Sequence, residues 1–160
     1  MISDVQTTAS QREVTTFTRL FQVLSQPTRL RIVRLLATSG RSACACELMD
    51  SIEEPEYHIS RHLGLLRDGG VLNEEPAGQW KYFAVNDNDP TVKALAHLVT
   101  TLYADVFELD DRNFQERLDL RKNGRCVVGS LKPHLLEHRQ QRSAKKRKTM
   151  ESQPDSTIIG

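Results

Sequence analysis

The sequence of 160 residues lacks any long hydrophobic run. No stretch approaches the roughly 18 consecutive apolar residues that a membrane-spanning helix needs. Residues 1–22 also lack the basic-then-apolar order of a secretory signal. We therefore expect a cytoplasmic protein with no membrane partner. Its 38% hydrophobic and 27% charged residues are the balance of a soluble globular domain with a core of its own.

Cysteine is scarce, and only Cys44, Cys46 and Cys126 occur. An odd number of thiols in a cytosolic chain argues against a disulfide framework and leaves metal binding and redox chemistry open. The chain also lacks a Cys-x-x-Cys motif, a glycine-rich phosphate-binding loop and a second domain that could supply a cofactor. We therefore expect no enzyme activity and no organic cofactor.

Excess charge is almost lacking, because the formal net charge is +1 at pH 7. The distribution is nevertheless uneven, since residues 132–160 are rich in Lys and Arg and carry the run KKRK at 145–148. Such a run can bind phosphate non-specifically or remain a solvated, disordered tail, and the sequence leaves its role open. We expect disorder over this tail and over the polar residues 1–12, with one folded domain over 13–131.

The first part of this domain shows apolar residues at helical spacing. Short breaks at proline, glycine and acidic residues divide the pattern into separate helices. The pattern predicts four helices, over roughly 13–25, 27–39, 46–51 and 55–68.

The second part begins after Gly70, where β-branched and aromatic residues predict two short strands at 71–73 and 80–85. The segment Pro-Ala-Gly at 76–78 predicts the turn between them. Asp89 then caps a long predicted helix whose apolar stripe continues to Val106. Because the stripe is wide for a terminal helix, we expect part of it to face a partner subunit.

This order of elements predicts a mainly α, dimeric winged helix-turn-helix protein with a small β-hairpin. At about 100° per residue, Ile59, Leu63 and Leu66 share one face of the fourth helix and should point inward. The outer side and the hairpin carry polar side chains suited to phosphates and base edges. We predict DNA contacts from Tyr57, His58, Ser60, Arg61, Gln79 and Lys81.

Several motifs in this order resemble the ArsR/SmtB family of metalloregulatory repressors. They are LSQPTRLRIV at 24–33, ISRHL at 59–63, LLRDGG at 65–70 and GQWKY at 78–82. The resemblance covers roughly residues 15–110. It implies a homodimer that represses transcription by binding a palindromic operator and leaves when an inducer binds. The operator sequence and the target genes stay open.

The segment CACEL at 44–48 resembles the Cys-x-Cys-Asp-Leu signature of the family's arsenical-responsive members. In those members a third cysteine follows three residues later, where this chain has Met49, whose thioether is a far poorer arsenic ligand. Cys126 is the only other thiol that could complete the site, from the same or the partner chain. Three thiolates suit As(III) or Sb(III) equally, whereas structural zinc prefers four ligands. We therefore predict As(III) or Sb(III) as the inducer, bound by Cys44, Cys46 and Cys126.

The spacing of Cys44 and Cys46 also suggests a switch. Residues two apart point roughly 200° away from each other in a helix but the same way in an extended chain. We therefore hypothesise that ion binding unwinds the start of the third helix and thereby shifts the DNA-reading helix. Two alternatives remain: a repressor that senses thiol oxidation or sulfide, and a constitutive DNA-binding regulator without an inducer.

Overall fold

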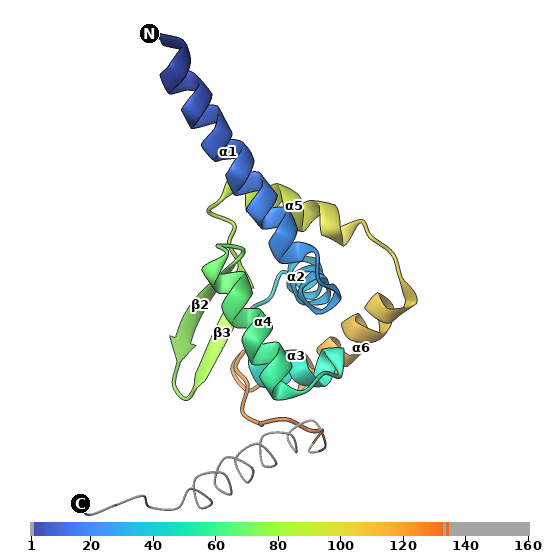
Figure 1. Ribbon diagram of the computed structural model, residues 1–160. Coiled ribbons are helices and arrows are strands. Elements are labelled where there is room, and N and C mark those ends of the chain that lie inside the picture. The colour runs from blue at the N-terminus through green and yellow to red at the C-terminus, as the bar shows by residue number, and fades with distance from the viewer. Residues whose placement is uncertain (1, 133, 135–160) are drawn as a thin grey trace, which may run out of the picture.

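The computed structural model describes residues 2–132 and 134, so nearly all of the predicted basic tail lies outside the described residues (Figure 1). Six helices and three strands are assigned within this part of the chain. Their order is α1 (Ile2–Leu24), α2 (Pro27–Ser39), β1 (Ala43–Cys44), α3 (Ala45–Ile52), α4 (Glu56–Asp68), β2 (Leu72–Ala77), β3 (Trp80–Val85), α5 (Pro90–Thr100) and α6 (Asp105–Asp119).

Helix α2 begins at a proline and ends at a glycine. Pro27 opens α2, because its fixed φ and missing N–H suit a first helical turn. Gly40 ends α2 in the left-handed region, with φ of 61°.

We expected disorder over 1–12 and a helix only from residue 13, but α1 already begins at Ile2. No glycine or proline interrupts the chain before Pro27, so nothing in this segment stops a helix from extending.

The predicted hairpin is present, and it belongs to a three-stranded antiparallel sheet with the order β1-β3-β2. Strand β2 is longer than expected, and the turn lies at Gly78, which adopts a φ of 62°. Strand β1 was not predicted, because two residues are too short to show a pattern. It pairs Cys44 with Tyr82 of β3, which places a cysteine at the base of the hairpin.

The predicted long helix through Val106 is wrong, because residues 101–104 separate α5 from α6 (Figure 1). The hydroxyls of Thr100 and Thr101 donate to the carbonyls of His97 and Leu98, each over 2.7 Å. Such side-chain bonds compete with the helical ladder and favour a helix end. The break lets α6 turn back and pack against α3.

The core confirms the inward face predicted for α4, because Ile59, Leu63 and Leu66 are fully buried. They pack with apolar residues of α2, α3 and β3. The arrangement is the predicted winged helix-turn-helix, in which α3 and α4 form the helix pair and β2 and β3 the wing. None of the described helices is long and apolar enough to cross a membrane.

Candidate metalloid centre and nucleic-acid interface

The three cysteine sulfurs lie within 4.8 Å of one another in a single chain. The Sγ atoms of Cys44 and Cys46 are 2.9 Å apart, and those of Cys46 and Cys126 are 3.7 Å apart. Cys44 and Cys126 are buried, whereas Cys46 is partly exposed. The fold therefore gathers every thiol of the chain into one cluster that one soft ion could bridge.

Cys44 and Cys46 meet because the chain changes conformation between them. Cys44 ends β1 and caps α3 in an extended conformation, with φ of −86° and ψ of 164°. Its N–H donates to the Glu47 carboxylate over 3.0 Å, which forms half of a capping box. The two thiols are thus already adjacent while α3 begins at Ala45. Our hypothesis that α3 must unwind to bring them together is unnecessary in this geometry.

Cys126 reaches the pair because the chain reverses direction after α6. Asn123 and Gly124 form the turn, with φ of 52° and 72°. Gly124 suits this left-handed conformation because it has no Cβ. The Cys126 N–H then donates to the hydroxyl of Tyr82 over 2.7 Å, and its thiol donates to the Val128 carbonyl over 2.9 Å. Cys126 is therefore anchored to the wing strand that also pairs with Cys44.

A buried arginine of α6, Arg117, lies against the cluster. Its Nη2 atom is 3.5 Å from the Cys126 sulfur and 3.8 Å from the Cys46 sulfur. The same atom donates to the Val128 carbonyl over 3.1 Å. On its other side, Nε lies 3.5 Å from a carboxylate oxygen of Asp50 in α3. Sequence reasoning missed Arg117, because we expected no helix to pass from this segment back to α3.

A second arginine, Arg121, lies two residues beyond the end of α6 and fixes the start of α3. It holds the fully buried Glu47 carboxylate through two hydrogen bonds of 2.8 and 2.7 Å. It also donates to the Ser42 carbonyl over 2.7 Å. Since Glu47 in turn accepts from the Cys44 N–H, this ion pair supports the backbone that carries the thiol pair.

The surroundings of Cys44 and Cys126 raise the pKa of both thiols. A hydrogen bond with Cys46, followed by burial, raises the pKa of Cys44. Burial raises the pKa of Cys126. Because burial penalises the charged thiolate, the neutral thiol is the favoured form of these two side chains.

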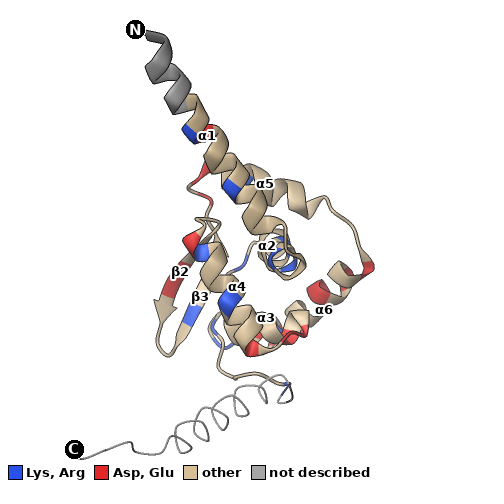
Figure 2. Cartoon of the chain, viewed as in Figure 1, with Lys and Arg blue, Asp and Glu red and all other residues tan. Residues whose placement is uncertain are grey.

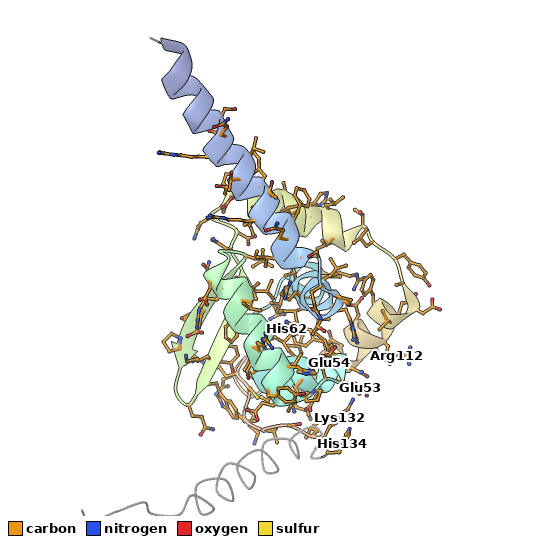
Figure 3. All side chains as sticks on the ribbon, in the orientation of Figure 1. Glu53, Glu54, His62, Arg112, Lys132 and His134 are labelled. Carbon is orange, nitrogen blue, oxygen red and sulfur yellow. The ribbon has the colours of Figure 1, made fainter. Side chains whose placement is uncertain are left out.

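The segment after Cys126 connects the cluster to the turn between α3 and α4. The Ser130 hydroxyl and the Leu131 N–H donate to the Asp50 carboxylate, the latter over 2.8 Å. Lys132 donates to the Asp50 carbonyl over 3.0 Å and forms an ion pair with Glu53, the residue that ends α3. Figure 3 shows Glu53, Lys132 and His134 together at this turn. We call residues 126–132 the C-terminal strap.

The residues predicted to contact DNA lie on α4 and the wing. Ser60 and Arg61 of α4 and Gln79 and Lys81 of the wing are exposed, whereas Tyr57 and His58 are partly buried. Lys81 forms an ion pair of 2.9 Å with Glu74. Figure 2 shows basic residues on α4 and β3, with acidic residues on β2 and along α6.

A groove of about 610 Å³ joins these two sets of residues. It lies between α4, the wing and the strap, and its walls include Cys44 and Cys46. Ser60, Gln79 and Lys81, three of the predicted DNA contacts, line the same groove. The thiol cluster is therefore directly adjacent to the surface predicted to read DNA.

Comparison with known proteins agrees with this geometry. Residues 26–74 match the family described as bacterial regulatory protein, arsR family. The chain is 35% identical over 83 residues to an uncharacterized HTH-type transcriptional regulator of Methanocaldococcus jannaschii, covering 52% of this chain and 90% of that one. It is 38% identical over 72 residues to the arsenical resistance operon repressor of Escherichia coli, where the match covers 45% of this chain and 61% of that protein.

Among solved structures, reduced HlyU from Vibrio cholerae aligns with a TM-score of 0.54 and 23% identity. The alignment covers 61% of this chain and 98% of that one. At this identity the likeness concerns the fold alone. Together the comparisons confirm the prediction of a DNA-binding regulator rather than an enzyme.

Proposed function

Because the chain belongs to the arsR family of bacterial regulatory proteins, we propose that it is a transcriptional repressor whose homodimer binds operator DNA. As(III) or Sb(III), bound by Cys44, Cys46 and Cys126, releases it. The observation that carries this proposal is the gathering of all three sulfurs within 4.8 Å in one chain. The arsenical repressor of Escherichia coli, of which the chain spans 61%, supports the choice of inducer.

The chemistry of the inducer suits a buried, neutral cluster. Arsenous acid, As(OH)3, reacts with three thiols so that three As–O bonds break and three As–S bonds form. Each thiol proton leaves with one hydroxyl group as water, and no net charge enters the site. A divalent ion on three thiolates would instead leave one negative charge, which is costly to bury. The adjacent cation Arg117 is already opposed by Asp50, so the neutral product requires no further counter-ion.

Operator binding is assigned to α4 and the wing. Ser60 and Arg61 on α4, with Gln79 and Lys81 on the wing, are exposed and carry the donors that phosphates and base edges accept. Tyr57 and His58 lie one turn earlier on α4, near its N-terminal end. We assign the base-edge contacts to α4 and the phosphate contacts to the wing, as this fold commonly docks.

Release of DNA follows from the position of the cluster. Its sulfurs belong to the base of the wing, the start of α3 and the strap that contacts the α3–α4 turn. Drawing the sulfurs onto one atom displaces these elements relative to α4, without unwinding α3. A differential affinity of a few kcal/mol between the two conformations is enough to empty the operator.

The proposed homodimer has apolar surface available. Val14, Phe17 and Phe21 lie on one side of α1 and are exposed to 59%, 43% and 58%. Leu98 of α5 and Leu102 just after it are exposed as well. Exposed apolar side chains grouped at helical spacing are typical of subunit interfaces. Val14→Glu combined with Phe21→Glu should convert the dimer to a monomer in sedimentation equilibrium.

The test of the inducer is operator binding by the fully reduced protein. Fluorescence anisotropy on DNA from upstream of the protein's own gene should show tight binding, which arsenite or antimonite weakens by at least about tenfold, or 1.4 kcal/mol. Arsenate, which has the same element but no lone pair to direct three sulfurs, serves as the control ligand. Unchanged operator affinity with arsenite would reject the proposal.

One observation favours a second candidate function, a thiol redox sensor. The sulfurs of Cys44 and Cys46 are 2.9 Å apart, and the Cys126 sulfur is 3.7 Å from that of Cys46, so oxidation could join a pair. The two functions can be distinguished under excess reductant, because only a metalloid sensor then releases DNA when arsenite is added. Release by peroxide without arsenite, reversed by a reductant, would favour the redox sensor.

A further inference from the structure

We propose that Arg117 is the positioning residue that keeps Cys126 in the cluster and thereby makes the site three-coordinate. This inference rests on the proposed function and adds a residue that selects between ligands that need three sulfurs and ligands that need two. Cys44 and Cys46 would form a two-sulfur site on their own. By holding the strap against α3, Arg117 would keep the third sulfur, that of Cys126, within reach of the same ion.

Arg117 contacts the strap at two points, the Cys126 sulfur and the Val128 carbonyl. Its Nη2 atom is 3.5 Å from the Cys126 sulfur and donates to the Val128 carbonyl over 3.1 Å. The Cys126 thiol donates to this same carbonyl. One guanidinium nitrogen therefore fixes both the thiol and the acceptor that orients it.

The other side of Arg117 faces α3. Its Nε atom lies 3.5 Å from the Asp50 carboxylate, which also accepts from Ser130 and Leu131 of the strap. Arg117 and Asp50 thus connect the beginning and the end of the strap to one helix. Because the guanidinium is planar and has several donors at fixed angles, it can span both contacts, whereas a lysine ammonium cannot.

Arg117 is also poorly satisfied for a buried cation. Only 3% of it is exposed, and Nε and Nη1 have no hydrogen-bond partner among the described residues. Unpaired buried donors weaken a fold, so stability alone does not favour an arginine here. An arginine that holds a ligand's sulfur in place accounts for that cost, as groups behind metal ligands commonly do.

The thiol pair does not depend on Arg117 in the same way. The backbone of Cys44 is fixed by β1 and by Glu47, and Arg121, just after the end of α6, holds Glu47. The Arg117 contact with the Cys46 sulfur, at 3.8 Å, is the longest of its contacts with the cluster. Loss of Arg117 should therefore release Cys126 and leave the pair in place.

The experiment compares two trivalent arsenicals on the reduced full-length protein. Arsenite can bond three sulfurs, whereas phenylarsine oxide keeps its phenyl group and bonds only two. Arg117→Gln should weaken arsenite binding about 10–100-fold, the usual effect of removing a group behind a metal ligand. Binding of phenylarsine oxide and of operator DNA should change less than twofold. Arg112→Gln, at an exposed position of the same helix, is the control and should change nothing.

A double-mutant cycle excludes a merely structural role. Like Arg117→Gln, Cys126→Ser should weaken arsenite binding and leave phenylarsine oxide binding unchanged. Adding Arg117→Gln to Cys126→Ser should weaken arsenite binding no further. Equal weakening of both arsenicals, or unchanged arsenite binding, in Arg117→Gln would overturn the inference. If Arg117→Gln fails to bind operator, Arg117→Lys takes its place in the experiment. We expect Arg117→Lys to lose part of its arsenite binding and to keep its binding of phenylarsine oxide and operator. Full retention of arsenite binding in Arg117→Lys would contradict the inference. If Cys126→Ser leaves wild-type arsenite affinity unchanged, the proposed three-sulfur site itself fails.

Discussion

The thiol pair and the strap bring sulfur to the same point by opposite means. Cys44 and Cys46 are adjacent because a strand ends and a helix begins between them, a local arrangement of three residues. Cys126 lies 80 residues from Cys46 in the chain and arrives only because α6 packs on α3 and the chain then reverses. The two sulfurs of the pair are therefore brought together within three residues, whereas the Cys126 sulfur reaches them only through contacts between distant segments.

This difference separates two properties of a sensor. Under the proposed function, the two sulfurs of the local pair would capture a soft ion, and the third, from a distant segment, would connect capture to the rest of the fold. The end of the strap contacts Asp50 in α3 and Glu53 in the turn before α4. Cys126 would therefore be the ligand that reports occupancy to α4.

The largest expected effect concerns the Arg121–Glu47 ion pair, which supports the backbone of the thiol pair. Arg121→Met leaves the fully buried Glu47 carboxylate without its partner, so the free energy of unfolding should fall by about 3–5 kcal/mol. Urea unfolding followed by circular dichroism measures this. Arg121→Met combined with Glu47→Gln should recover part of the loss, because no unpaired charge remains. A loss below about 1 kcal/mol would mean that the start of α3 does not need the Arg121 ion pair.

The next prediction tests whether the Cys126 sulfur, unlike those of Cys44 and Cys46, is needed only by a ligand that bonds three sulfurs. Cys44→Ser should abolish binding of both arsenite and phenylarsine oxide, because each ligand needs the pair. Cys126→Ser should weaken arsenite about 10–100-fold, by analogy with the loss of a supporting group, and spare phenylarsine oxide. Isothermal titration of the reduced variants measures both. If Cys44→Ser and Cys126→Ser behaved alike towards phenylarsine oxide, the distinction between pair and strap would be lost.

The same difference explains what the sequence could predict. The inward face of α4 and the hairpin follow from local spacing, so they were predicted. The thiol pair was singled out by its resemblance to the family signature, and Cys126 only because no other thiol remained. Arg117 and Arg121 escaped detection. We expected the helix that begins after Asp89 to continue through Val106, and a straight helix would not have returned to α3. The break at Thr100 and Thr101 depends on hydroxyls bonding to nearby carbonyls, which residue spacing does not reveal.

A smaller effect follows from pH. The pKa values of Cys44 and Cys126 are raised in the fold, the first by its hydrogen bond with Cys46 and burial, the second by burial. Their contribution to stability is therefore complete below the ordinary thiol pKa of 9.0 and is lost as pH rises above it. Each thiol should lower the free energy of unfolding by at most about 1.4 kcal/mol per pH unit in that window. Urea unfolding at pH 8, 9 and 10 tests this.

The control for the pH effect is the variant that lacks one of these thiols. Cys126→Ser should show a shallower alkaline decline than the wild-type protein, by the slope of one group. Identical slopes would show that the Cys126 thiol ionises as easily in the fold as in the unfolded chain. The buried cluster would then not favour a neutral ligand over a divalent ion.

The smallest expected effect comes from the exposed attachment of the strap, the Lys132–Glu53 ion pair, as opposed to the buried one at Arg117 and Asp50. Lys132 pairs with Glu53 at the exposed end, and this contact holds the pKa of Glu53 below its ordinary value. Because solvent screens an exposed pair, Lys132→Met should cost no more than about 1 kcal/mol, measured by urea unfolding. Arsenite binding should stay within twofold of wild type, because Arg117 and Asp50 still hold the buried end. If Lys132→Met weakened arsenite as strongly as Arg117→Gln, the exposed turn would be the true anchor of Cys126.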